Sequence, residues 1–314
     1  MTDSSLTIMK QFLLQGAYLL LPALIAFIFA KSWKQQNTKL TFPRKIQDDS
    51  NVESEDLTKH FAVKPSVSYT IATSPHRAKV TIVCISDTHG HHRELTMPKG
   101  DILIHAGDFT LFGRDNPRNS TGNVQENDNP LQDFNDWLGS LDYKYKIVVN
   151  GNHEVNAKYK NRAKELLSNG TLLVNEALEI DLNELTLESN DRKESRDGDN
   201  MLRIYGMQFY WPTLDGNNPY HAKVYDFPKA IDILVTHTPV EGYVDRDRGC
   251  PALRKLVYEI KPKIVISGHE HNATGIVESS NAGDSKIVYV NAANAKGGIK
   301  NGHSLGKQPT ILHY

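Results

Sequence analysis

The sequence predicts an α/β fold with at least partly parallel sheets over residues 79–314, and three observations support this. Short apolar runs of strand length recur along this part of the chain. Segments with helical spacing of apolar residues stand between several of them, an alternation typical of α/β proteins. The chain, with 314 residues of which 39% are hydrophobic and 23% charged, is long enough for one large domain or two small ones, each with a core.

Six apolar runs rich in Val and Ile predict strands. They are "KVTIVCIS" (79–86), "DILIHAGD" (101–108), "YKIVVNGN" (145–152), "AIDILVTHT" (230–238), "KIVISGHE" (263–270) and "SKIVYVNAAN" (285–294). Residues 130–141, 154–169 and 251–260 have the spacing of helices. Residues 114–130 and 188–200 are too polar to pack, which predicts long surface loops.

The N-terminal part predicts a membrane anchor rather than a folded domain. After a tail at residues 1–10, residues 11–30 run without a charge between Lys10 and Lys31, about the length at which a helix crosses the hydrocarbon core. A cleaved signal peptide ending at Ala30 is the alternative, although the apolar run exceeds the usual length of one. Residues 31–78 are polar and nearly aperiodic, which predicts a linker with little structure of its own.

Positive charges around residues 11–30 predict the orientation of this anchor. Only Lys10 precedes the apolar run, whereas Lys31, Lys34, Lys39, Arg44 and Lys45 follow it. Short flanks rich in Lys and Arg stay on the cytoplasmic side. We therefore expect a single-pass membrane protein whose C-terminal domain faces the cytosol.

Side chains able to bind metal follow five of the predicted strands. They are Asp87 and His89 after the first, Asp108 after the second, Asn152 and His153 after the third, His237 after the fourth, and His269 and His271 after the fifth. A lone histidine is more often a surface or core residue. Because ligands bind beyond the carboxyl ends of strands in open α/β sheets, the joint pattern predicts one shared site.

The residue types at these positions indicate the class of metal. Imidazole nitrogens and carboxylate oxygens suit divalent first-row metals. The chain has only two cysteines, Cys84 and Cys250, which is too few for a thiolate metal cluster or a disulfide framework. The candidate ligands Asp87, His89, Asp108, Asn152, His237, His269 and His271 exceed what one four-coordinate ion uses. Two ions that share a carboxylate would use them all, as in two-metal sites for displacement at phosphorus.

The ordered motifs resemble the calcineurin-like metallophosphoesterase superfamily. They are Asp87-x-His89, Gly107-Asp108, Gly151-Asn152-His153-Glu154, His237 and Gly268-His269-x-His271. The resemblance covers residues 79–296 and is nearest to the branch named for its metallophosphoesterase domain, small enzymes that act on phosphodiesters. It implies two mixed β-sheets in a sandwich flanked by helices.

The resemblance also implies roles for individual residues. Asp87, His89 and His271 would hold one ion, Asn152, His237 and His269 the other, and Asp108 would bridge them. His153 would be the general acid that protonates the leaving oxygen, and a bridging water would be the nucleophile. The ions, divalent or trivalent, would be Mn, Fe, Zn or Mg.

One departure from many relatives bears on His153. No carboxylate stands between Asp108 and Arg114, where those relatives carry an acid that orients the catalytic histidine. This weakens a protein-phosphatase interpretation. Whether Glu154 or a distant group orients His153 stays open at this point.

The sequence therefore predicts a membrane-anchored, dinuclear, metal-dependent hydrolase, a phosphodiesterase for nucleotides or other small phosphodiesters. A phosphomonoesterase with the same site is the first alternative. A DNA nuclease would need a basic groove, which a net charge of -1 does not indicate, so nucleic acid is not an expected partner. A non-catalytic, membrane-anchored binding module is the fourth hypothesis, and the intact set of candidate ligands argues against it.

Overall fold

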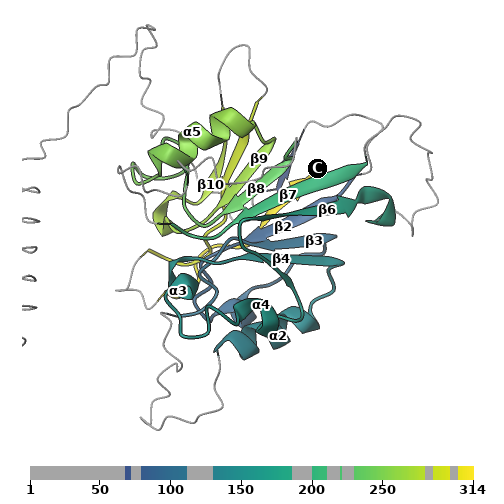
Figure 1. Cartoon of the computed structure of the whole chain (residues 1–314). Helices are drawn as coiled ribbons and strands as arrows, with labels where there is room; N and C mark the ends of the chain where they lie inside the picture. Colours follow the sequence, from purple (N-terminus) through teal and green to yellow (C-terminus); the bar gives the residue numbers. More distant parts are fainter. Residues whose placement is uncertain are drawn as a thin grey trace, which may run out of the picture. The chain divides into compact units, whose positions relative to one another are not determined.

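Two mixed six-stranded sheets face each other in the computed structural model (Figure 1). The structure describes residues 68–71, 79–111, 130–185, 200–210, 220, 230–279, 286–297 and 303–314. The predicted α/β fold with two mixed sheets is confirmed for this part of the chain.

The first sheet has the strand order β1-β12-β2-β3-β4-β5. Its strands are β1 (Ser68–Thr70), β12 (Thr310–His313), β2 (Thr81–Ile85), β3 (Ile102–His105), β4 (Tyr145–Val149) and β5 (Thr171–Leu173). β2 to β5 run parallel, β12 lies antiparallel to β2, and β1 runs parallel to β12. The parallel strands bring three polar strand ends to one edge.

The second sheet has the order β10-β11-β9-β8-β7-β6. Its strands are β6 (Glu176–Asp181), β7 (Met201–Met207), β8 (Ile233–Thr236), β9 (Ile264–Ser267), β10 (Gly275–Glu278) and β11 (Val288–Asn291). The inner four strands are parallel, and β6 and β10 at the two edges are antiparallel to their neighbours.

Three of the described α-helices cover the outer faces of the two sheets (Figure 1). The α-helices are α2 (Pro130–Ser140), α3 (Asn152–Val155), α4 (Ala163–Leu166) and α5 (Pro251–Ile260), and the 3₁₀ helices are η2 (His92–Glu94), η3 (Leu182–Leu185) and η5 (His271–Ala273). In β2, Ile82 and Cys84 join the core between the sheets, while Val83 and Ile85 join the core under α2 and α4. α5 packs on the outer face of the second sheet in the same way. Burial on both faces explains why the central strands are apolar throughout.

The helices predicted over 130–141 and 251–260 are confirmed, but the single helix over 154–169 is wrong. Two short helices, α3 and α4, stand there instead. Asn156 Nδ2 donates to the carbonyl oxygen of Asn152 at 2.7 Å, and such side-chain bonds compete with the helical ladder. The chain then turns so that the Tyr159 hydroxyl lies 2.7 Å from Thr110 Oγ1.

The first sheet begins before residue 79. β1 lies inside the predicted linker over residues 31–78, and it pairs with β12. Ile71, next to β1, is buried in the core between the sheets. The predicted linker therefore extends too far toward the domain.

The tail (1–10), the predicted transmembrane helix (11–30) and most of both predicted loops lie outside the described residues. Among the helices that the structure describes, none is both long enough and apolar enough to cross a membrane.

Candidate metal centre

The eight predicted site residues lie together where five strands end, three in the first sheet and two in the second. Asp87 and His89 follow β2, Asp108 follows β3, Asn152 and His153 begin α3 after β4, His237 follows β8, and His269 and His271 follow β9. The residues therefore share one edge of the sandwich, as the parallel topology requires.

Several of these residues have left-handed backbone. The φ angle is 54° at Asp87, 44° at His89, 55° at Asp108 and 68° at His269. Each such conformation costs on the order of 1 kcal/mol or more and persists only where the surroundings fix it. These left-handed residues turn the chain sharply where β2, β3 and β9 end.

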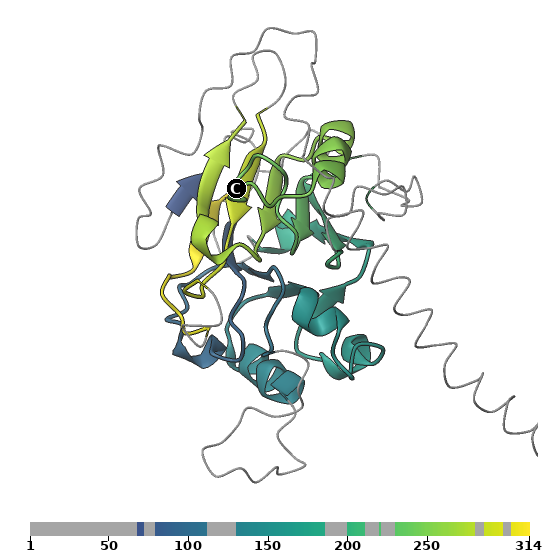
Figure 2. The same cartoon turned by 90° about the vertical axis from the view of Figure 1, so that its left-hand side faces the viewer.

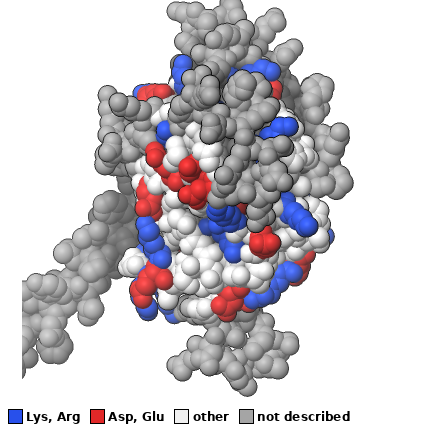
Figure 3. Space-filling view, turned by 90° about the vertical axis from the view of Figure 1, so that its right-hand side faces the viewer, with Lys and Arg blue, Asp and Glu red and all other residues white. Residues whose placement is uncertain are grey.

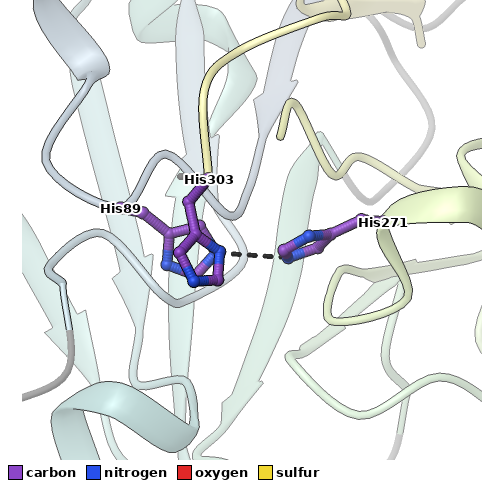
Figure 4. A group of neighbouring side chains, drawn as sticks. All are labelled: His89, His271 and His303. Atoms are coloured by element: carbon purple, nitrogen blue, oxygen red, sulfur yellow. Dashed lines mark hydrogen bonds between the residues drawn. The ribbon is translucent and has the colours of Figure 1, made fainter. Parts of the chain in front are cut away.

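The first group of side chains contains Asp87, His89 and His271, and Figure 4 draws the two histidines. Nε2 of His271 lies 3.0 Å from Asp87 Oδ1 and 3.1 Å from Nε2 of His89. Burial lowers the pKa of His89 to about 3, so this imidazole is neutral and has a lone pair for a metal. Burial opposes protonation of His271 too, but the bond to Asp87 prevails and raises its pKa.

The second group contains Asp108, His237 and His269. Nε2 of His237 lies 3.4 Å from Asp108 Oδ2, and its Nδ1 donates to the carbonyl oxygen of Ala106 at 2.7 Å. That bond fixes the ring and leaves Nε2 facing the carboxylates, as an outer hydrogen bond does for metal-binding histidines. Burial alone would lower the pKa of His237, but the negative charges of Asp108 and Asp87 outweigh this effect, and the pKa is raised to about 9. A metal cation beside these carboxylates would displace that proton.

Asn152 and His153 come from the first turn of α3. Asn152 Oδ1 is buried and makes no hydrogen bond within the described structure. The backbone N–H of His153 donates to Asp108 Oδ1 at 2.9 Å, and its Nε2 lies 3.5 Å from Asp108 Oδ2. His153 Nδ1 lies 2.8 Å from the carbonyl oxygen of Thr110, an acceptor, so Nδ1 carries the proton in that bond. A backbone carbonyl therefore orients His153.

Glu154 connects the loops that carry these residues. Its carboxylate is buried and accepts hydrogen bonds from Gly151 N (2.9 Å), Asp108 N (2.9 Å), Thr110 N (3.0 Å) and Thr110 Oγ1 (2.8 Å). Glu154 does not contact the imidazole of His153 in these bonds. It instead holds Thr110, whose carbonyl orients His153. Glu154 therefore acts on His153 indirectly, through Thr110.

The glycines before the ligands leave no room for a side chain. A Cβ at Gly268 would overlap Ser86 Oγ and Asp87 Oδ2, and a Cβ at Gly151 would overlap Asp108 Oδ1. These close approaches let the loops of the two sheets meet around the carboxylates.

His303 is a residue that the sequence reasoning missed. It is buried, and its ring centroid lies 4.2 Å from that of His89. It precedes β12 in a polar, glycine-rich stretch, "KGGIKNGHSLG", rather than following an apolar strand, so the pattern of strand ends does not include it. The two buried histidines His92 and His105, by contrast, pack against the ring of Phe134, away from this group.

The donor set fits a metal. Among the residues that the structure describes, three groups have ligand atoms within 4.8 Å of one another: His89, His271 and His303; His89, Asp108 and His153; and Asp108, His237 and His269. His237 Nε2 and Asn152 Oδ1 are buried atoms without a hydrogen-bond partner in the described structure, and a cation that displaces the proton of His237 would satisfy both. Nitrogen and oxygen donors without thiolates suit Mn, Fe, Zn or Mg.

Comparisons with known proteins give a consistent result. The family model described as "Calcineurin-like phosphoesterase" matches residues 80–273. Human "Metallophosphoesterase domain-containing protein 1" is 30% identical over 273 residues, covering 77% of this chain and 71% of that protein. A UPF0046 protein of Caenorhabditis elegans, K07C11.7, is 29% identical over 306 residues, covering 92% of this chain and 94% of its own length. A second UPF0046 protein of Caenorhabditis elegans, C25E10.12, is 32% identical over 236 residues, covering 68% of this chain and 75% of its own length.

Proposed function

The chain belongs to the calcineurin-like phosphoesterase family of metal-dependent phosphoesterases, and we propose that it hydrolyses small phosphodiesters, nucleotides among them, with two metal ions. In this proposal Asp87, His89 and His271 hold one ion, and Asn152, His237 and His269 hold the other. Asp108 bridges them.

The position of Asp108 is the observation that supports this assignment best. Asp108 belongs to two of the three ligand groups, one with His89 and one with His237 and His269. Its Oδ2 lies 3.4 Å from His237 Nε2, while its Oδ1 is held by the backbone N–H of His153 at 2.9 Å. Although burial opposes ionisation, His237 and His153 lower the pKa of Asp108, so it is a carboxylate at neutral pH.

The bound ions would supply a water activated as nucleophile and would neutralise charge that develops on the phosphoryl oxygens. The protein's own contribution to the departure of the leaving group comes from His153. When this ring carries a proton on each nitrogen, Nδ1–H donates to the carbonyl oxygen of Thr110 and Nε2–H faces the site. Transfer of the Nε2 proton to the leaving oxygen leaves a neutral ring in the same orientation, because the bond to Thr110 is unchanged.

A phosphomonoesterase with the same residues is the alternative. Nucleic acid remains an unexpected partner: on the face in Figure 3, the described basic and acidic side chains are interspersed. On this face the described basic side chains do not form the continuous basic groove that a long polyanion would need.

We also propose that residues 11–30 anchor the protein in a membrane with the catalytic domain in the cytosol. The uncharged length and the positive residues after it support the proposal. Protease protection on sealed membranes, with detection of the C-terminus, tests it. A protected domain would contradict the cytosolic orientation, and a soluble product that starts near Lys31 would contradict the anchor.

The activity is tested on the purified protein with added Mn²⁺, using bis-aryl and mono-aryl phosphates with the same leaving group. We expect the diester to be hydrolysed faster, and Asp108→Asn to abolish the activity while the exposed control Asp142→Asn keeps it. A faster monoester reaction would support the phosphomonoesterase. Metal bound without hydrolysis of either ester would favour a binding module, and metal analysis with fewer than two ions per chain in saturating metal would contradict the dinuclear site.

A further inference from the structure

We propose that His303 is a substrate-binding residue whose imidazole donates a hydrogen bond to a phosphoryl oxygen on the His89–His271 side of the centre. The inference rests on the proposed function, because it assigns a contact of the same site to a residue outside the strand-end motifs.

The ring of His303 lies among the histidines of the centre. Its centroid is 4.2 Å from that of His89, 5.8 Å from that of His271 and 6.0 Å from that of His153. Figure 4 shows His303 approaching from a different segment of the chain than His89 and His271 and overlapping His89 in this view. It therefore lies next to a predicted ligand pair and the predicted general acid.

The surroundings of His303 differ from those of a packing histidine. His92 and His105 each pack against the aromatic ring of Phe134, and His92 also against Trp137. His303 instead has three site histidines as ring neighbours, and its exposed fraction is 7%. His303 therefore lies among polar rings of the site rather than against aromatic rings of the core.

The backbone fixes His303 in this position. Its φ angle is 57°, a left-handed conformation that a histidine adopts at a cost. The next residues are held against the segment 294–296, because Lys296 N donates to Ser304 O at 2.8 Å and Gly306 N donates to Asn294 O at 2.9 Å. Asn294 N in turn donates to Ser86 O at 2.9 Å, so this segment lies beside the loop that carries Asp87 (Figure 2).

A substrate contact is more consistent with the chemistry than a further metal ligand. Asp87, His89, His271 and Asp108 already offer four protein ligands to the first ion, and a catalytic metal keeps a position open for water or substrate. A fifth protein ligand would occupy that position. One ring nitrogen from each of His89, His271 and His303 lies within 4.8 Å of the other two, which places His303 within reach of an oxygen atom bound beside them.

The test measures phosphate binding, which needs no turnover. The full chain is loaded with Mn²⁺, metal content is measured by mass spectrometry, and the dissociation constant of inorganic phosphate is measured by calorimetry. We expect His303→Ala to keep its metals and bind phosphate about 10- to 100-fold more weakly, the range for one hydrogen bond to a charged group. His303→Gln, which keeps an N–H donor, should lose less. The control is His313→Ala, in the same C-terminal segment, where the exposed ring lies 2.9 Å from Ser68 Oγ.

Three results would overturn the inference. Loss of metal from both variants would make His303 a ligand or a structural support of the centre. Unchanged phosphate affinity with metals retained would mean that the ring does not reach the substrate. Absence of phosphate binding to the metal-loaded wild type would remove its premise. If phosphate binds and the binding depends on His303 but no ester is hydrolysed, the inference stands and the proposed function fails.

Discussion

Replacing Glu154 by Gln tests whether one carboxylate holds the loops of the centre together. Each oxygen of Glu154 accepts two hydrogen bonds, Oε2 from the backbone of Gly151 and Asp108 and Oε1 from the backbone and hydroxyl of Thr110. Glutamine has the same shape but only one acceptor oxygen. When its NH₂ group faces Gly151 and Asp108, both of those bonds are lost. When it faces Thr110, the bond from Thr110 N is lost, while the Thr110 hydroxyl can turn to accept from the amide and donate to Tyr159. At least one of the four bonds is therefore lost.

The structure gives the magnitude of the effect. A buried hydrogen bond to a charged group contributes about 1.5 to 3 kcal/mol, so the loss of one lowers the free energy of unfolding by about 1.5 to 3 kcal/mol. This is a large share of the 5 to 15 kcal/mol typical of a domain. Asp108 and Thr110 would also lose their anchor, so Glu154→Gln should bind less metal and position His153 less well.

The measurement is urea unfolding of the metal-free protein in chelator, which separates the stability of the fold from the binding of metal. Glu165→Gln is the matched control, because this exposed carboxylate pairs with Arg162 at the surface and its replacement should leave stability nearly unchanged. A loss below about 1 kcal/mol for Glu154→Gln would refute the reasoning, since it would show that the four bonds add little beyond those of a neutral amide.

Three further predictions concern the site and the pH dependence of stability. Asp108→Asn should lower bound metal more than His89→Ala, because the bridging carboxylate neutralises both cations; equal losses by metal analysis would contradict a bridge. His153→Gln should keep its metals and slow esters with alkyl or ribosyl leaving groups by about 10² to 10⁴, and nitrophenyl esters much less; equal losses would mean that His153 does not act as general acid. Burial opposes ionisation of Asp232, but Lys263, Arg203 and Tyr314 outweigh it and lower its pKa. The stabilising contribution of Asp232 is therefore present above the unfolded-state pKa near 4 and is lost as pH falls through the lower folded-state pKa. The unfolding free energies of wild type and Asp232→Asn should converge as pH falls from 7 to 3. A difference that stays constant would contradict this prediction.

Residues that follow apolar strands were predictable because periodicity and topology determine their position. Asp87, Asp108 and His237 each follow a run buried on both faces, and parallel strands bring such ends to one edge. Helix α5 was predictable from its apolar spacing, and Pro251 occupies its first position.

Other features depend on contacts that a single sequence does not display. The orienting group of His153 is a backbone carbonyl, an atom that every residue has, so no residue type marks Thr110. His303 reaches the centre through a turn in a polar segment without periodicity. The break between α3 and α4 follows from side-chain bonds of Asn156 and Tyr159 to the site, which outweigh the local preference for a continuous helix.

The centre joins the two sheets. Asp87 and Asp108 belong to loops of the first sheet, whereas His237, His269 and His271 belong to the second, and His269 N donates to Asp87 Oδ2 at 2.9 Å. A cation held between them would therefore crosslink the two halves of the sandwich in the way a disulfide crosslinks two loops, although reversibly. Removal of metal would then increase hydrogen exchange at the facing ends of β2 and β9 together, while the opposite ends of the same strands would stay protected.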